Sequence, residues 1–240
     1  MKKILLIALI IFPMFIYGQD KKEETAPVHD KQAKAILDKT SARYQKHNNV
    51  YLYFEYIIKN NQKNITETRY GELYSAKGNK YRLVLPEQYM FCDGNKLYSY
   101  DEKSNEMYIN YYDPNSQSVL SPEQLLNIYK KGFKYQYRGE IGINSKVRKN
   151  GQITKVPKKL YIIDLYPEDP KKSPYSIVRL WIDQNNYEIV SVKYQGKNGI
   201  DYFINILETK YDTSMPQKLF TFDKSSLPKD VDIEDFTTED

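Results

Sequence analysis

The chain has 240 residues, with 36 Lys or Arg against 31 Asp or Glu, and its formal net charge is +5. The two signs are interspersed, so the sequence lacks the basic stripe that a nucleic-acid-binding protein needs, and no nucleic-acid partner is predicted. The single cysteine, Cys92, has no partner for an internal disulfide. The length fits one domain, whose core has to be stable without a covalent cross-link.

The N-terminus has the three parts of a cleavable export signal. Lys2 and Lys3 form a basic start, an apolar run extends from Ile4 to Tyr17, and Gly18 is the small residue before the expected cleavage site. The run is shorter than the roughly 20 apolar residues that cross a membrane as a helix. We therefore predict export by a signal peptide that is removed.

The expected first residue of the mature chain, Gln19, decides whether the exported protein carries lipid. A bacterial lipoprotein needs a cysteine at that position to receive its acyl chains. We therefore expect a periplasmic protein that is not lipidated. The predicted organisation is a signal peptide at 1–18, a disordered polar linker at 19–29 and a single domain at 30–240.

Two segments have the pattern of amphipathic helices. In residues 31–47, apolar positions recur every three or four residues. The predicted apolar face consists of Ala35, Ile36, Leu37, Ala42 and Tyr44.

The second predicted helix covers residues 122–131. Ser121 is a suitable N-cap, Pro122 suits the first helical position and Gly132 ends the helix. Its apolar face consists of Leu125, Leu126, Ile128 and Tyr129.

Most of the remaining chain alternates between apolar runs of strand length and turn residues such as Asp93-Gly94. The predicted strands are 50–58, 69–76, 80–85, 88–92, 96–100, 106–111, 133–141, 158–166, 176–183, 188–195 and 200–209. Consecutive strands with two helices predict a mainly β (α+β) fold. We expect a half-open antiparallel β-barrel, or a strongly curved sheet, of about ten to eleven strands with a helical lid.

The reactive side chains do not form the pattern of a catalytic or metal site. Cys92 needs a nearby base to act as a nucleophile, but His29 and His47 lie in the predicted linker and at the end of the first helix. We predict that Cys92 is a buried strand residue. The two histidines lack metal-ligand spacing, so neither a metal nor another cofactor is predicted.

Carboxylates are the remaining candidates for catalysis. Asp164, Glu168 and Asp169, or Asp101 and Glu102, are conceivable acid–base pairs for glycoside hydrolysis. They fall at predicted strand ends in turn-like contexts, where solvated carboxylates are ordinary. We therefore predict that the protein is not an enzyme. A curved apolar sheet with two amphipathic helices encloses a cavity for an apolar ligand, or is a packed domain that binds a protein partner.

Several short segments occur in an order known from one family. They are Gly71-Glu72-Leu73-Tyr74, Gly78-Asn79-Lys80-Tyr81-Arg82-Leu83, Cys92-Asp93-Gly94, Leu97-Tyr98-Ser99-Tyr100-Asp101, Ser121-Pro122-Glu123-Gln124-Leu125, Leu180-Trp181-Ile182-Asp183 and Leu219-Phe220-Thr221-Phe222. In this order, nearly the whole mature chain resembles the LolA family of periplasmic outer-membrane lipoprotein carriers. The resemblance implies a half-open barrel under a helical lid, with a cavity for the acyl chains of lipoproteins.

The resemblance also implies roles for individual residues. Lys77 stands where the family commonly has an arginine that holds the lid closed by hydrogen bonds, although lysine lacks the planar fork of arginine. The implied lipid-binding residues are Leu52, Phe54, Tyr56, Leu73, Leu83, Leu85, Leu180 and Ile182, and the implied lid residues are Leu125, Leu126 and Tyr129.

The implied partners are acylated lipoproteins, a lipoprotein-releasing transporter in the inner membrane, and an acceptor in the outer membrane or that membrane itself. The resemblance implies a monomeric carrier. The alternative is a periplasmic regulatory module of the same fold that senses lipid or mislocalised lipoproteins. Loss of a carrier leaves lipoproteins at the inner membrane, whereas loss of a sensor changes stress signalling only.

Overall fold

The computed structural model describes residues 29–113, 130, 132–222, 225 and 228–238. The predicted signal peptide, the linker up to residue 28 and nearly all of the predicted second helix lie outside the described residues. The same holds for the predicted lid residues Leu125, Leu126 and Tyr129. Within the described part of the chain, no helix is long and apolar enough to cross a membrane.

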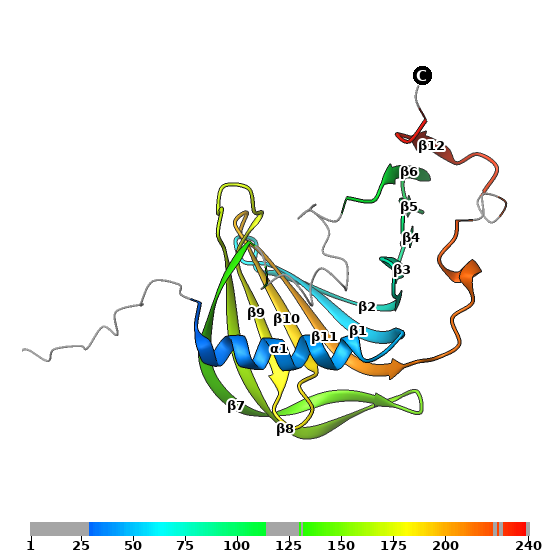
Figure 1. Cartoon of the computed structure of the whole chain (residues 1–240). Coiled ribbons are helices and arrows are strands. Elements are labelled where there is room, and N and C mark those ends of the chain that lie inside the picture. Colours follow the sequence, from blue (N-terminus) through cyan, green and yellow to red (C-terminus); the bar gives the residue numbers. More distant parts are fainter. Residues whose placement is uncertain (1–28, 114–129, 131, 223–224, 226–227, 239–240) are drawn as a thin grey trace, which may run out of the picture.

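The described residues form one α-helix, α1 (Lys31–Gln45), a short 3-10 helix, η2 (Gln217–Leu219), and twelve strands (Figure 1). The strands are β1 (Asn49–Asn60), β2 (Ile65–Ala76), β3 (Lys80–Leu85), β4 (Gln88–Asp93), β5 (Lys96–Asp101), β6 (Glu106–Tyr111), β7 (Phe133–Lys149), β8 (Gln152–Pro167), β9 (Tyr175–Asp183), β10 (Ile189–Gly196), β11 (Ile200–Tyr211) and β12 (Asp232–Asp235).

All twelve strands belong to one sheet in the order β12-β6-β5-β4-β3-β2-β1-β11-β10-β9-β8-β7. Neighbouring strands are antiparallel except β12, which pairs with β6 in parallel. The sheet ends at β7 and β12, so it is open, and it is strongly curved: Figure 1 shows β3–β6 set at a steep angle to β7–β11. The predicted mainly β fold, a curved open sheet crossed by a helix, is confirmed.

The start of helix α1 is set by its N-cap residue, Asp30. The Asp30 side chain accepts hydrogen bonds from the N–H groups of Gln32, at 2.7 Å, and Ala33, at 3.1 Å, which satisfies two free donors of the first turn. The buried face consists of Ala33, Ile36, Leu37, Thr40, Ser41 and Tyr44. The prediction was wrong for Ala35 and Ala42, which are exposed. Alanine is small enough for either face, so it does not fix the orientation of a helix.

The strand predictions hold in position but not always in length. Strands β7 and β8 extend eight and six residues beyond the predicted 133–141 and 158–166 toward their shared turn. The turn residues Asn150 and Gly151 have φ of 50° and 79°, the left-handed values of a tight hairpin. The Asn-Gly pair is a turn signal in the sequence. The strands beside it were not predicted because they are polar and lack the alternation of apolar and polar residues.

Two apolar clusters hold the two ends of the sheet. Under α1, buried residues of the helix pack on β7–β10. At the other end, Tyr100, Met107 and Ile109 of β5 and β6 pack with the C-terminal residues Val231 and Ile233. The short strand β12, which was not predicted, therefore closes the β6 end with apolar side chains. Cys92 is a fully buried residue of β4, as predicted.

Candidate functional site

A row of apolar side chains crosses four neighbouring strands. Leu52 of β1 lies directly opposite Leu73 of β2, Leu73 opposite Leu83 of β3, and Leu83 opposite Met90 of β4. Directly opposed residues of antiparallel strands share a face. These four residues, called the apolar row below, are each only half-buried. Leu52 packs against the cluster beneath α1, which places the row on the same face of the sheet as the helix.

Phe54 and Leu85 converge beside the row, above Gly71. A Cβ atom at Gly71 would lie 2.6 Å from Phe54 Cζ and 2.7 Å from Leu85 Cδ2, closer than real Cβ contacts come. Because glycine has no side chain, the ring and the leucine side chain occupy that space instead. The residue at 71 therefore shapes the apolar surface although it contributes no side chain to it.

The surface continues onto β11. Ile206 lies opposite Phe54, and Ile204 lies opposite Tyr56. The ring of Tyr56 stacks on that of Tyr202, with centroids 6.1 Å apart and an interplanar angle of 7°. Burial, aided by the neighbouring tyrosine hydroxyls, raises the pKa of Tyr56 to about 12. A tyrosine hydroxyl is uncharged at neutral pH in any environment of ordinary pKa, and the raised pKa of Tyr56 reflects how apolar its surroundings are.

The predicted lipid-binding residues fall into two groups. Leu52, Phe54, Tyr56, Leu73, Leu83 and Leu85 lie together on β1–β3. Leu180 and Ile182 of β9 are fully buried in the cluster beneath α1, where a ligand reaches them only if the helix moves. A binding role for either group stays a prediction.

The prediction missed three residues that extend the same surface: Met90, Ile204 and Ile206. The signal that finds them is the two-residue alternation within the strands already predicted. The sequence analysis applied this alternation to the residues of β1 but not to those of β4 and β11.

The C-terminal end of α1 is fastened to the residue before β10 and to the end of β11. Arg43 Nε donates to Glu188 Oε1 at 3.0 Å, and the Tyr211 hydroxyl donates to the same oxygen at 3.0 Å. His47 stacks on the Tyr211 ring at 4.0 Å, and its Nδ1 lies 2.6 Å from Asp212 Oδ2. These contacts hold the helix across the sheet beside the apolar row.

Lys77, the predicted lid latch, is exposed in the turn between β2 and β3. Its Nζ donates to Asn48 Oδ1 at 3.0 Å, and its backbone N–H donates to the Asn48 carbonyl at 3.2 Å. Lys77 thus contacts the connection between α1 and β1. The predicted second helix lies outside the described residues, so the latch role stays a prediction.

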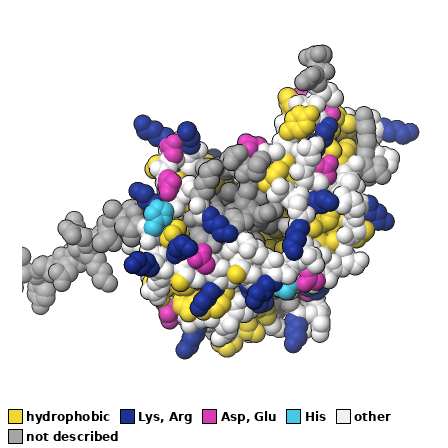
Figure 2. All heavy atoms as spheres, in the orientation of Figure 1, with side chains coloured by type: hydrophobic (Ala, Val, Ile, Leu, Met, Phe, Trp, Pro, Cys, Tyr) yellow, Lys and Arg dark blue, Asp and Glu magenta, His cyan; other side chains and the backbone are white. Residues whose placement is uncertain are grey.

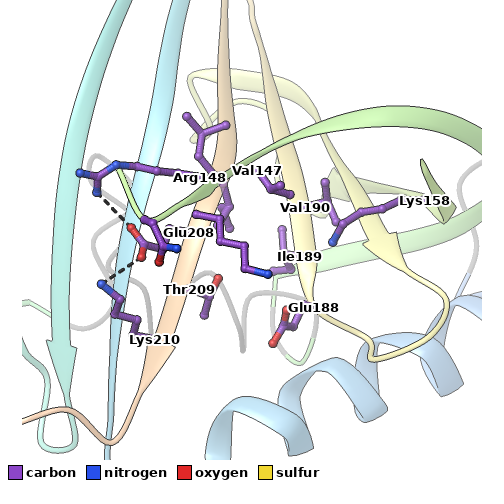
Figure 3. A pocket seen from close by; sticks show the side chains of 13 residues that line it. Val147, Arg148, Lys158, Glu188, Ile189, Val190, Glu208, Thr209 and Lys210 are labelled. Carbon is purple, nitrogen blue, oxygen red and sulfur yellow. Dashed lines mark hydrogen bonds and ion pairs between the residues drawn. The ribbon is translucent and has the colours of Figure 1, made fainter. Parts of the chain in front are cut away.

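A separate hollow of about 340 Å³ lies between the β7–β8 hairpin and strands β10 and β11 (Figure 3). Most of its charged groups are paired: Glu208 accepts from Arg148 at 3.0 Å and lies 2.9 Å from Lys210 Nζ, and Lys158 contacts Asp183 at 2.8 Å. An acyl chain offers no hydrogen bonds to such groups. This hollow is a poorer fit for an apolar ligand than the apolar row.

One candidate carboxylate differs from its prediction. Asp164 was expected as a solvated group at a strand end, but it lies within β8 with 1% of its surface exposed. Its two oxygens accept hydrogen bonds from Arg179 at 2.6 and 2.8 Å, and Arg138 lies 3.5 Å away. Asp164 points to the face of β8 opposite to the apolar cluster, and a carboxylate can be buried there because the neighbouring strand β9 supplies its counter-ion, Arg179. Asp164 is therefore engaged in an ion pair.

The other candidates for chemistry lie apart. Glu168 and Asp169 are exposed beyond β8, and Glu102 is exposed in the turn after β5. Burial raises the pKa of the Cys92 thiol, which disfavours the nucleophilic thiolate. Among the described residues, no group of three or more His, Cys, Asp or Glu side chains is placed to hold a metal ion.

No family model and no curated protein matches the sequence. Solved structures that resemble the chain include a DUF1329 family protein from Desulfovibrio piger, with 15% identity, a TM-score of 0.44, and coverage of 82% of this chain and 99% of that one. A LolA superfamily protein from Nitrosomonas europaea has 12% identity, a TM-score of 0.40, and coverage of 79% and 97%. LprF from Mycobacterium bovis has 11% identity, a TM-score of 0.43, and coverage of 79% and 98%.

The structural neighbours of the chain thus include a LolA superfamily protein, as the sequence resemblance predicts. The observed architecture, a curved open sheet with a helix across one face, agrees with a LolA-like open barrel. At these identities and TM-scores the likeness carries no role over to this chain.

Proposed function

We propose that the protein is a periplasmic carrier that shields the acyl chains of lipoproteins and transfers them from the inner to the outer membrane without catalysing a reaction. The observation that supports this proposal is the apolar row: leucines and a methionine from four strands form one face that is left half-open beside α1. An acyl chain is the kind of ligand that such a face holds, because it offers apolar surface and no hydrogen bonds.

The half-open geometry suits a carrier more than a storage protein. Each buried methylene contributes about 0.8 kcal/mol, so complete burial of a chain of about 12 methylenes would give roughly 10 kcal/mol. A face that is open along one side removes only part of the chain from water. The affinity is then moderate, and the ligand is able to leave for a membrane.

The proposed partners follow from this role. They are acylated lipoproteins, a lipoprotein-releasing transporter in the inner membrane, and an acceptor in the outer membrane or that membrane itself. The predicted export signal at residues 1–18 supports a periplasmic location.

A release assay tests the carrier role. The mature chain is incubated with inner-membrane vesicles that contain a lipoprotein and its transporter, and the supernatant is analysed by native mass spectrometry. We expect a complex with the acylated protein, and none with a cargo variant that lacks the lipidated cysteine. Failure to release or bind any acylated protein would overturn the proposal. Binding without release, together with a deletion that alters only stress signalling, would replace the carrier with a sensor.

A further inference from the structure

The distal part of the β7–β8 hairpin is an exception to the interspersed charges of the chain as a whole, because it carries one sign of charge. Residues 141–160, called the basic hairpin below, include no Asp or Glu. Their cations are Lys146, Arg148, Lys149, Lys155, Lys158 and Lys159. The whole chain has 36 basic against 31 acidic residues, so this segment holds more than the entire net excess of +5.

Three of these cations fasten the hairpin to the rest of the sheet. Lys146 contacts Glu55 at 2.7 Å, and Arg148 contacts Glu208 at 3.0 Å and lies 4.2 Å from the centroid of the Tyr53 ring. Lys158 contacts Asp183 at 2.8 Å. The basic hairpin is thus held against the sheet by ion pairs at several points along its length.

The other three cations, Lys149, Lys155 and Lys159, are exposed. Within the described ranges, none of them lies within ion-pair distance of a carboxylate. Their ammonium groups are available to a partner of opposite charge.

Exposed isoleucines accompany these lysines on both faces of the hairpin. By register, Ile153 shares one face with Lys155 and Lys159, and Ile141 and Ile143 share the other face with Lys149. Ile141, Ile143 and Ile153 have 42%, 37% and 46% of their surface exposed, and they are three of the seven large apolar side chains exposed in the described chain. Figure 1 shows the hairpin leaving the sheet at the bottom of the view, with its turn at the lower right. In the same orientation, Figure 2 shows apolar and basic side chains side by side along the lower part of the molecule.

We propose that the basic hairpin docks on a membrane surface that contains anionic phospholipid. The ammonium groups would contact headgroup phosphates, and the isoleucines would enter the boundary with the acyl chains. Exposed apolar side chains next to cations favour a lipid surface, since a purely acidic partner gives isoleucine nothing to contact. The proposal goes beyond the carrier role, because it does not require the apolar row to bind a ligand.

Vesicle flotation tests this proposal with the mature chain and no added acyl ligand. We expect binding to vesicles of phosphatidylcholine mixed with phosphatidylglycerol, and none to phosphatidylcholine alone. Binding should be lost at about 1 M salt, where the screening length is about 3 Å. Equal binding to the two kinds of vesicle would overturn the proposal.

Matched variants locate the surface. Lys149→Gln/Lys155→Gln/Lys159→Gln should weaken binding about a hundredfold, given the attraction of each surface cation to an anionic leaflet. The control Lys63→Gln/Lys103→Gln/Lys171→Gln removes three exposed lysines elsewhere and should bind like the parent. Equal loss in both triple variants, when far-UV circular dichroism shows both folded, would overturn the assignment to the hairpin.

A third variant separates a membrane from an acidic protein. Ile153→Ser should weaken vesicle binding several-fold without changing the charge. If Ile153→Ser binds like the parent and soluble polyglutamate displaces the protein from vesicles, the hairpin is a site for acidic peptides and the membrane proposal fails. Failure of the lipoprotein release assay with vesicle binding intact would count against the carrier role alone.

Discussion

The ring of Phe54 lies over the backbone of Gly71, its partner across β1 and β2, at a distance that leaves no room for a side chain there. A Cβ atom at Gly71 would lie 2.6 Å from Phe54 Cζ and 2.8 Å from the Val84 carbonyl oxygen. The ring could move, but the backbone carbonyl could not move without disturbing β3. The shape of the apolar surface beside the row therefore depends on glycine at this position.

Substitution of this glycine should destabilise the fold. We expect Gly71→Ala to lower the free energy of unfolding by about 1–3 kcal/mol, the usual cost of overpacking. The control is Gly142→Ala in β7, where a Cβ meets nothing within 4 Å and φ is not positive, so the change should stay within about 0.5 kcal/mol. Urea denaturation measures both. Equal effects would show that Gly71 is not constrained by Phe54 and Leu85.

The two faces of β3 should differ in their effect on ligand binding. Leu83 and Val84 are adjacent and both half-buried, but successive strand residues point to opposite faces. Leu83→Gln should weaken the binding of a fluorescent acyl probe about tenfold, since it removes apolar contact worth about 1–2 kcal/mol. Val84→Gln should leave the affinity unchanged. Similar losses in both variants, at matched thermal stability, would place the ligand elsewhere.

Glu55, a buried carboxylate on the face of β1 opposite to the apolar row, should make the stability of the fold depend on pH. Glu55 is 3% exposed and accepts from Lys146 Nζ at 2.7 Å and Asn205 Nδ2 at 2.9 Å. Burial alone would raise the pKa of Glu55, but the hydrogen bonds from Lys146 and Asn205 outweigh it, so the pKa is lowered. The stabilisation is therefore complete above the unfolded pKa of about 4.3 and is lost as the pH falls through the folded pKa.

Removal of the lysine tests this relationship. Lys146→Met should cost about 1–3 kcal/mol at neutral pH, because the buried carboxylate loses a charged donor. The loss of stability from about pH 5 to about pH 3 should also become shallower. Lys155 lies directly opposite Lys146 in the hairpin, is exposed, and serves as the control in Lys155→Met. Urea denaturation across this pH range would refute the account if both variants kept the parent's pH profile.

The ion pair of Asp164 should contribute to stability. Arg179→Met leaves the buried carboxylate with Arg138, at 3.5 Å, and the Tyr166 hydroxyl, at 3.3 Å, and should cost about 2–4 kcal/mol. Arg69→Met breaks the exposed pair with Glu67 and should cost less than about 1 kcal/mol. Thermal unfolding distinguishes the two. An unchanged stability for Arg179→Met would mean that Asp164 is held by other groups.

The fastening of α1 predicts a change in helix dynamics. Arg43→Met removes the charged hydrogen bonds to Glu188, each worth about 1.5–3 kcal/mol. Amide hydrogen exchange in the last turn of α1 should then be faster by roughly tenfold or more. The control Lys46→Met changes an exposed residue next to the helix end. No difference between the variants would mean that the apolar contacts of Ile36, Leu37 and Tyr44 hold the helix alone.

Much of the apolar surface could be predicted because a strand has a strict period of two. Leu52, Phe54 and Tyr56 alternate along β1, and pairing with β2 and β3 brings Leu73 and Leu83 to the same face. The same period does not reveal which part of a face a helix covers. Leu180 and Ile182 have an equally apolar pattern, but they lie in the closed core beneath α1, and the sequence pattern does not distinguish the two cases.

Other features depended on contacts between distant residues. The burial of Asp164 requires Arg179 on the neighbouring strand, and that register was not predicted. The distal hairpin was missed because its strands are polar, even though Asn150-Gly151 is a strong turn signal. The distal hairpin is held against the sheet by ion pairs from Lys146 to Glu55 and from Arg148 to Glu208, and both glutamates lie far away in the sequence.

The most direct test of the central claim is to map a bound acyl chain. A spin-labelled fatty acid is titrated into the mature chain with labelled leucine, isoleucine and valine methyl groups, and paramagnetic broadening is measured by NMR. Broadening should be strongest at Leu52, Leu73, Leu83 and Leu85, and weak at Val84 and Ile109 on the opposite face. Absence of broadening, or broadening strongest at Val84 and Ile109, would contradict the claim that the apolar row holds the ligand.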